Sequence, residues 1–221
     1  MQRIEGQLLL SPTDLTKHLA CAHVTTLDLL ALDGRGDGRD LGATTPDDAL
    51  QLVFRKGTEH ESAYLQRLRS AGLSVAEIPT RFDLEGRRQA EAETLAAMRE
   101  GVDVVYQATF FDGRWGGQAD FLLRTDQPSD LGGWSYDIAD TKLARRLKVP
   151  ALLQMATYAE RLTVLQGVPP QRLTVVTGDG VERPWRLDDV ASYARRARAR
   201  LQEAVEAGAD TDPAPVPHCS Q

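Results

Sequence analysis

The sequence has few cysteines, few aromatic residues, no long apolar run and no excess of positive charge. Its two cysteines, Cys21 and Cys219, are too few for the disulfide framework of a small secreted protein. No stretch approaches the ~18 consecutive apolar residues of a membrane helix, and the amino terminus lacks the basic and apolar regions of a signal peptide. We therefore expect a cytoplasmic protein with no membrane contact.

The charge balance excludes a broad basic surface. The net charge is −6 and the isoelectric point is near 5.3, which counts against a nuclease or another nucleic-acid-binding protein. A metal site built from acids, with a local basic track beside it, remains compatible with this balance. With 221 residues, of which 42% are apolar, the chain can bury the core of one α/β domain with a helical addition.

Helical patterns dominate the first third of the chain. Ser11 and Pro12 form a helix start, and the leucine spacing predicts one helix over residues 12–32, with Cys21 inside it. Residues 33–46 are rich in Gly, Asp and Arg and predict a mobile loop. A second helix is expected over residues 47–71, with an inward face that includes Leu50, Val53, Phe54, Tyr64, Leu65 and Leu68.

Strands and helices alternate in the rest of the chain, which is typical of an α/β fold. A short strand is expected at residues 73–78, and a helix at 84–100 between the cap Asp83 and the stop Gly101. Asp112 and Gly113 predict a hairpin turn. The expected elements that follow are strands 102–111, 114–124 and 134–143, helix 150–166, strands 172–177 and 181–187, and helix 188–205.

Two acids and a lysine are expected to converge in these strands. On a strand, Asp140 and Lys142 point to the same face because side chains alternate, and Asp120 comes from the neighbouring strand. Mg²⁺ takes oxygen ligands, usually one or two carboxylates with waters and substrate phosphates. A lysine beside such an ion can orient water, take part in its deprotonation or stabilise charge on phosphorus. The set predicts metal-dependent cleavage of a phosphodiester.

The ordered set resembles motifs II, III and IV of the PD-(D/E)xK nuclease superfamily. Asp120, then Asp140-Thr141-Lys142, then Gln154 and Tyr158 match its RecB-like branch, and the resemblance spans residues 11–219. The nearest group is a family of bacterial RecB-like nuclease domains related to CRISPR-associated iron-sulfur exonucleases. Asp140 stands where many members have Glu, and its shorter arm would draw the metal inward.

This resemblance implies a restriction-endonuclease-like α/β fold, with a central mixed sheet flanked by helices. Residues 1–207 would form the nuclease domain, with an amino-terminal helix and loop at 1–46 and the core at 47–207; residues 208–221 would be a linker and the start of a cysteine cluster. The implied metal ligands are His60, Asp120, Asp140 and the carbonyl of Thr141. Lys142 would position or activate water, and Gln154 and Tyr158 would support the site.

His60 owes its predicted role to the family, where a histidine after Gly-x-x completes the metal site. Gly57-Thr58-Glu59-His60 resembles that motif. Taken alone, a single histidine on a helix is more often a packed or surface residue. Glu61 is the alternative ligand.

Three basic residues follow the lysine motif: Arg145, Arg146 and Lys148. They are expected to meet DNA phosphates, although charge runs are more often solvated faces. Gly116 and Gly117 weaken the strand of Asp120, which indicates a bulge or a close backbone approach, plausibly by nucleic acid, or else relief of packing beneath Trp115.

The cysteines have two interpretations. In the related family a cysteine like Cys21 joins three carboxy-terminal ones in a [4Fe-4S] cluster. Only Cys21 and Cys219 are present, so the resemblance implies an incomplete cluster in an amino-terminal fragment of a longer protein. Alternatively, both are ordinary reduced thiols.

The expected function is Mg²⁺- or Mn²⁺-dependent hydrolysis of DNA in DNA repair or processing. The substrate would carry a single-stranded region or a free end, and a helicase would be fused to or associated with the domain. A silent module that holds DNA ends for a helicase is the alternative. Glycoside hydrolysis, which also uses two acids, fits less well because aromatic residues for stacking sugars are only 6% of the chain.

Overall fold

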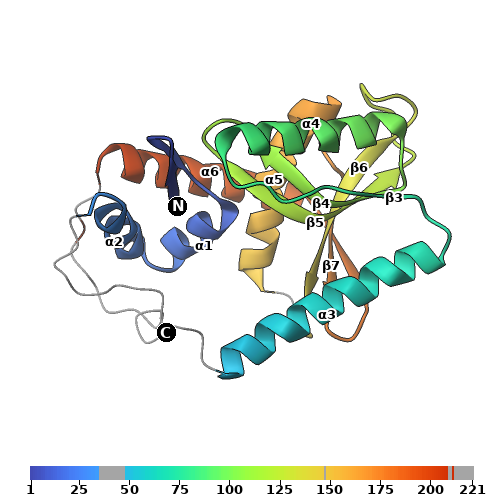
Figure 1. Cartoon of the computed structure of the whole chain (residues 1–221), viewed down its shortest axis with the longest axis horizontal. Coiled ribbons are helices and arrows are strands. Elements are labelled where there is room, and N and C mark those ends of the chain that lie inside the picture. The colour runs from blue at the N-terminus through green and yellow to red at the C-terminus, as the bar shows by residue number, and fades with distance from the viewer. Residues whose placement is uncertain (35–47, 147, 209–210, 212–221) are drawn as a thin grey trace.

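A six-stranded mixed sheet forms the centre of the molecule (Figure 1). The computed structural model describes residues 1–34, 48–146, 148–208 and 211. Strands β3 and β4, like β6 and β7, are parallel, and the other neighbouring pairs are antiparallel. The sheet order is β3 (Val75–Glu77), β4 (Val104–Phe111), β5 (Gly116–Thr125), β6 (Ser135–Lys142), β7 (Arg172–Thr177) and β8 (Glu182–Arg186). The expected α/β class with a mixed sheet is confirmed.

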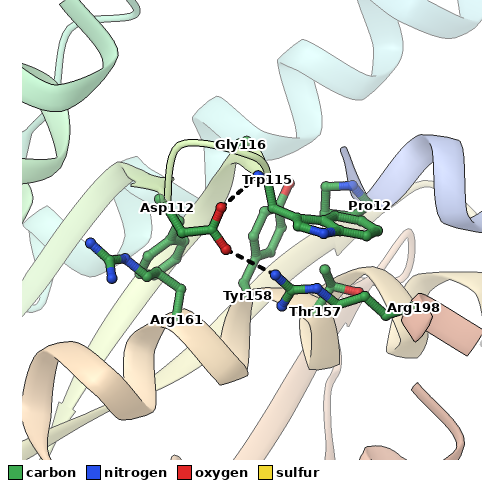
Figure 2. A pocket seen from close by; sticks show the side chains of 10 residues that line it. Pro12, Asp112, Trp115, Gly116, Thr157, Tyr158, Arg161 and Arg198 are labelled. Carbon is green, nitrogen blue, oxygen red and sulfur yellow. Dashed lines mark hydrogen bonds and ion pairs between the residues drawn. The ribbon is translucent and has the colours of Figure 1, made fainter. Parts of the chain in front are cut away.

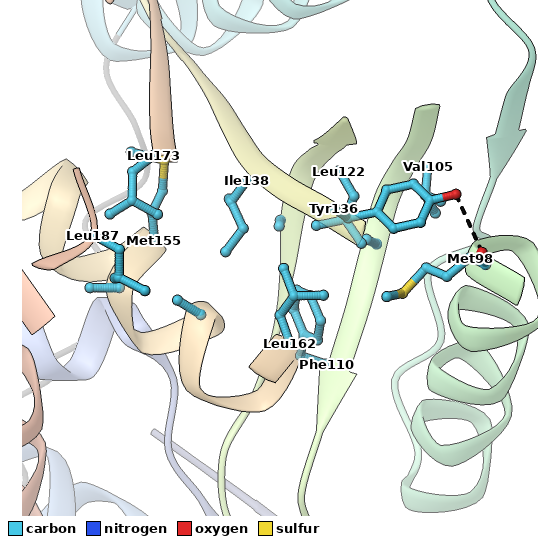
Figure 3. Close-up of a cluster of buried hydrophobic side chains, with 14 of the residues drawn as sticks. Met98, Val105, Phe110, Leu122, Tyr136, Ile138, Met155, Leu162, Leu173 and Leu187 are labelled. Carbon is cyan, nitrogen blue, oxygen red and sulfur yellow. Dashed lines mark hydrogen bonds between the residues drawn. The ribbon is translucent and has the colours of Figure 1, made fainter. Parts of the chain in front are cut away.

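Helices cover both faces of this sheet. On one face, α3 (Asp48–Ser70) packs Tyr64, Leu65 and Leu68 against Phe121. On the other face lie α4 (Leu84–Glu100) and α5 (Val149–Gln166). Figure 3 shows the larger core on this second face, where α4 and α5 meet alternate side chains of β4, β5 and β6. Because side chains alternate along a strand, the same pattern aims Asp140 and Lys142 toward α5.

Burial of large side chains holds these layers together. Tyr136 is fully buried, and its hydroxyl donates to the carbonyl of Val102 at 2.6 Å. Full burial of a Leu, Ile, Phe or Met side chain stabilises a fold by about 1.5–3 kcal/mol. The buried members drawn in Figure 3, among them Met98, Leu122, Ile138 and Leu162, therefore fix β6 between its neighbours.

The amino-terminal region differs from the prediction. In place of one helix over residues 12–32 there are two, α1 (Pro12–Ala20) and α2 (Ala22–Leu32), separated by Cys21 in an extended conformation with φ −159° and ψ 109°. A short hairpin of β1 (Gln2–Ile4) and β2 (Gln7–Leu9) precedes them. Together with α6 (Asp188–Glu206), these helices lie beside the sheet, on the left in Figure 1. The prediction of a continuous helix was wrong because no glycine or proline marks the break.

Helix α3 has about the expected length, but only three of the six residues predicted to face inward are buried. Tyr64 is buried, whereas the side chains of Leu50, Val53 and Phe54 are 42%, 53% and 59% exposed. The first half of α3 extends past the sheet in Figure 1, and its apolar side chains are accordingly exposed there. Periodicity predicts a face but not what lies opposite it. Most of the loop predicted at residues 33–46 lies outside the described residues.

The ends of the remaining predicted helices and strands lie within two residues of their predicted positions. Helix α4 matches at both ends because Asp83 caps it and Gly101, with φ 72°, stops it. The final hairpin and α6 begin and end near their expected positions. Among the described residues, no helix is both long and apolar enough to cross a membrane.

Candidate active site

The strands β5 and β6 separate at the position of the two predicted acids. Their last backbone pair is Phe121 with Ala139, so Asp120 and Asp140 face each other just beyond the ladder. The Asp120 carboxylate accepts the backbone N–H of Thr141 at 2.9 Å and its hydroxyl at 3.1 Å. Thr141, predicted to offer its carbonyl to a metal, therefore holds Asp120 through its N–H and hydroxyl groups.

Asp140 and Lys142 form an ion pair inside the fold. The distance from Lys142 Nζ to Asp140 Oδ2 is 2.7 Å, and the Asp140 side chain is only 12% exposed. This Oδ2 atom is buried and accepts no hydrogen bond of ordinary geometry from the described residues. Burial, followed by the charge of Asp120, raises the pKa of Asp140 to about 8. Burial would lower the pKa of Lys142, but Asp140, Asp120 and Glu61 raise it overall.

One cavity collects all five predicted catalytic residues. Its volume is about 120 Å³, and it lies between β5, β6 and α5, with α1 adding one residue. We call it the acid cavity. Its lining comprises Thr13, Gln118, Ala119, Asp120, Ile138, Asp140, Lys142, Gln154, Met155 and Tyr158. Gln154 and Tyr158 belong to it because they lie one turn apart on α5.

Tyr158 reaches this cavity because Gly117 leaves room for it. A Cβ atom on Gly117 would lie 2.7 Å from the Tyr158 hydroxyl oxygen. The ring stacks on Phe110 at 5.6 Å between centroids. Burial, followed by the charges of Asp140 and Asp120, raises the pKa of Tyr158, so its hydroxyl keeps its proton. The close approach at Gly117 is made by this tyrosine, and not by packing beneath Trp115.

A strained backbone lies opposite Asp120. Gln107, on β4, has φ 56°, which is uncommon for a residue with a side chain. The pairs on either side, Tyr106 with Phe121 and Ala108 with Ala119, place Gln107 across from Asp120. Its amide donates to Glu61 Oε1 at 2.5 Å. Burial, and then the charge of Asp120, raises the pKa of Glu61. Glu61 therefore lies within electrostatic reach of the acid cavity.

His60 does not line the acid cavity. Its Nε2 atom lies 3.1 Å from the carbonyl oxygen of Val176, so it carries the proton and donates. Ligating histidines commonly donate their other ring N–H to a carbonyl, which leaves Nδ1 as the atom for a metal. Within the described ranges, however, no three His, Cys, Asp or Glu side chains lie close enough to hold one ion. The structure brings Asp120 and Asp140 together and leaves His60 and Glu61 outside this pair.

Tyr158 also lines a smaller cavity, shown in Figure 2. The residues around this cavity join α6 to the hairpin of β4 and β5. Arg198 donates to Asp112 at 2.9 Å, pairs with Glu160, and lies 4.5 Å from the centre of the Trp115 ring. The volume is about 20 Å³, close to what one water needs. Arg198 therefore makes structural contacts between α6 and the hairpin of β4 and β5.

Cys21 lines a separate cavity of about 820 Å³ between α1, α2 and α6. Its thiol is partly exposed and unpaired. His18 lies in the same wall, and burial, followed by the charge of Arg200, lowers its pKa. Cys219 lies outside the described residues, so the predicted cluster ligands stay a prediction.

Three residues of the site carried no signal in the sequence. Thr13 enters the acid cavity from α1, Gln118 from β5, and Gln107 holds Glu61. Glutamine and threonine are common in ordinary structural positions, so they did not stand out. A left-handed backbone is usually indicated by Gly or Asn, and position 107 is neither. No family model matches the chain, and no curated protein matches its sequence.

Proposed function

We propose that this protein hydrolyses phosphodiester bonds of DNA with the help of Mg²⁺ or Mn²⁺. The observation that carries the proposal is the meeting of Asp120, Asp140 and Lys142 in one cavity with Gln154 and Tyr158. Paired carboxylates beside an ammonium group suit phosphoryl chemistry, in which positioning and charge stabilisation supply most of the rate.

The acid cavity fits a hard divalent cation. Asp140 Oδ2 is buried and paired with Lys142, and it accepts no hydrogen bond of ordinary geometry from the described residues. Asp120 keeps one oxygen beyond the two bonds from Thr141. Oxygen donors of this kind match Mg²⁺, which is usually bound by one or two carboxylates plus waters and phosphate oxygens. Asp120 and Asp140 would hold the ion, with water and phosphate oxygens as its further ligands. When bound, the ion lowers the pKa of water and polarises the phosphoryl oxygens.

The chain's own groups then orient the reactants. The Lys142 ammonium group lies next to Asp140 and donates to water or to a phosphate oxygen, which stabilises the charge that develops there. The Tyr158 hydroxyl keeps its proton and is a donor toward the same space. Gln154 offers one donor and one acceptor group from the preceding turn. Iron-sulfur binding by Cys21 and an associated helicase belong to the same proposal through the resemblance alone.

The test is cleavage of labelled single- and double-stranded DNA with Mg²⁺ or Mn²⁺. We expect the wild type to cut, and Asp140→Asn and Lys142→Ala to lose activity while keeping the wild-type circular dichroism spectrum. Asp126→Asn removes an exposed acid and is the matched control, with activity unchanged. Folded wild-type protein that binds DNA but cuts with neither ion, in a sample whose iron content is known, would contradict the proposal and favour a silent DNA-end-binding module.

A further inference from the structure

A second cavity opens beside the acid cavity and shares two residues with it. Its volume is about 270 Å³, and both Lys142 and Gln154 line the two cavities. We call it the basic cavity. Its lining is Lys142, Leu143, Ala144, Arg146, Lys148, Pro150, Ala151, Gln154, Val175 and Thr177. Because Lys142 and Gln154 stand between them, a group in the basic cavity would be the immediate neighbour of a group in the acid cavity.

The two cavities have opposite charge. Among the described residues, two carboxylates line the acid cavity, whereas three cations and no carboxylate line the basic cavity. Arg146 and Lys148 are exposed at its edge. A polyanion is therefore attracted to the basic cavity and repelled from the acid cavity, except where a cation neutralises the acids.

Hydrocarbon lines part of the basic cavity. It comes from the exposed Leu143 and Pro150 and the buried Ala151 and Val175, and no aromatic ring is among the described lining residues. A sugar or base could leave water against these groups, but it would find no ring to stack on. Gln154 is the only side-chain amide among the described residues of this lining, so hydrogen-bond selection among the bases would be weak.

The wall next to Lys142 is held by a close backbone contact. A Cβ atom on Gly178 would lie 2.1 Å from the carbonyl oxygen of Leu143, and the Gly178 N–H lies 3.4 Å from the Ala144 carbonyl oxygen. The turn after β7 therefore fixes the segment that leaves β6. A pre-formed wall of this kind favours binding because little chain order is lost when a ligand enters.

We propose that the basic cavity holds the nucleotide next to the scissile phosphate, from an unpaired part of the strand. The inference rests on the proposed function, which supplies DNA as the ligand. Arg146 and Lys148 bind the flanking phosphate, and the sugar and base lie against Leu143, Pro150 and Val175. A paired nucleotide enters only after it leaves its duplex, at a cost of a few kcal/mol. The cavity therefore selects single-stranded regions or frayed ends without selecting a base.

The first experiment measures binding without cleavage. A fluorescent oligothymidine is titrated by anisotropy in EDTA against the wild type, Arg146→Ala and Ala144→Phe, which places a ring over the exposed edge of the cavity. Arg99→Ala and Ala199→Phe make the same changes at exposed positions on α4 and α6 and are the matched controls. We expect Kd to rise about tenfold or more for both cavity variants, which corresponds to about 1.4 kcal/mol, and to stay unchanged for the controls.

The second experiment locates the nucleotide. Single-stranded substrates carry one abasic residue at successive positions, and cleavage is followed with Mn²⁺. We expect KM to rise for one position next to the cut bond in the wild type and this rise to vanish in Ala144→Phe. If the wild type cuts but Ala144→Phe binds and cuts like Ala199→Phe, the basic cavity is not the nucleotide site.

The two proposals fail in different ways. Oligothymidine binding that Ala144→Phe weakens, in a protein that never cuts, supports the basic cavity and contradicts the nuclease activity. Cleavage that is indifferent to Ala144→Phe supports the activity and contradicts the cavity. A wild type that does not bind oligothymidine contradicts the basic cavity whether or not it cuts duplex DNA.

Discussion

The two ends of β6 each carry a buried aspartate, but the two carboxylates have different partners. Asp137, near its start, accepts the backbone N–H groups of Gln171 and Arg172 at 2.7 and 3.2 Å. Asp140, near its end, has an oxygen with no hydrogen bond of ordinary geometry, and it faces Asp120. Both residues are buried. The first carboxylate therefore fastens the chain before β7, whereas the second faces another carboxylate and is paired with Lys142.

Under the proposed function, this difference divides structural from functional roles along a single strand. Asp137 accepts two backbone N–H groups, which offset part of the cost of its burial, although burial still raises its pKa. A buried acid beside another acid is costly, and such a site is retained where a ligand or a reaction uses it. The predictions below test whether the two aspartates divide in this way.

The largest effect is expected on cleavage. Asp140→Ala and Lys142→Ala should each reduce the rate of DNA cleavage by roughly 10²–10³ or more, the range seen when one charge-stabilising group is lost. Asp137→Ala should leave the rate of the folded fraction unchanged. Single-turnover rates, corrected for folded protein, make the comparison. Equal losses at Asp137 and Asp140 would show that the division along β6 is false.

The next effect is on stability and runs in the opposite order. Asp137→Ala should lower the free energy of unfolding by about 2 kcal/mol, because two backbone N–H groups lose their acceptor. For a chain of this size that is roughly 4–8 °C in Tm. Asp140→Asn should raise Tm of the metal-free protein, because it removes a charge that burial and Asp120 disfavour. Thermal scans in EDTA measure both, and a fall for Asp140→Asn would contradict the assignment.

A smaller effect on stability and cleavage should follow from crowding the Tyr158 ring. Gly117→Ala places a Cβ atom against the Tyr158 hydroxyl group, so the ring must shift. Overpacking of this kind costs about 1–3 kcal/mol, and we expect the lower end because Tyr158 borders two cavities. Cleavage should fall about tenfold with it. Gly133→Ala, where a Cβ atom meets nothing within 4 Å, is the control and should change neither quantity.

The last effect is a change in how the stability of the metal-free protein depends on pH. Because the pKa of Asp140 is raised in the folded state, the folded protein holds this proton at pH values where the unfolded chain has released it. Stability of the metal-free protein should therefore fall as pH rises from about 4 toward about 8. Asp140→Asn should flatten this fall, and Mg²⁺ should raise Tm more at pH 8 than at pH 5. Parallel curves for the two proteins would contradict the origin of the slope.

Local signals predicted the elements whose two ends both carry them. Helix α4 has Asp83 and Gly101, and the hairpin of β4 and β5 has Asp112 and Gly113. The break at Cys21 has no such signal, since an extended cysteine between two helices follows from how α1 and α2 pack on α5 and α6. The prediction that Phe54 faces inward was wrong because spacing along a helix does not say where the sheet ends.

The acid pair was predictable because strand alternation and a hairpin are local rules. They place Asp120, Asp140 and Lys142 on one face without further knowledge. The contribution of Thr13 from α1 could not be predicted, because Thr13 lies more than a hundred residues before the other residues of the acid cavity. The placement of His60 also depends on how α3 crosses β7, which no spacing fixes.

The parallel pairing of β6 with β7 bears on the order in which the chain assembles. Strands β4, β5 and β6 are joined by short connections, so Asp120 and Asp140 can meet early. A parallel neighbour needs a crossover, and here that crossover is α5, the helix of Gln154 and Tyr158. We expect the acids to be in place before the wall that would receive a strand. A nascent or partly refolded chain would then be unable to cut until its last third has docked.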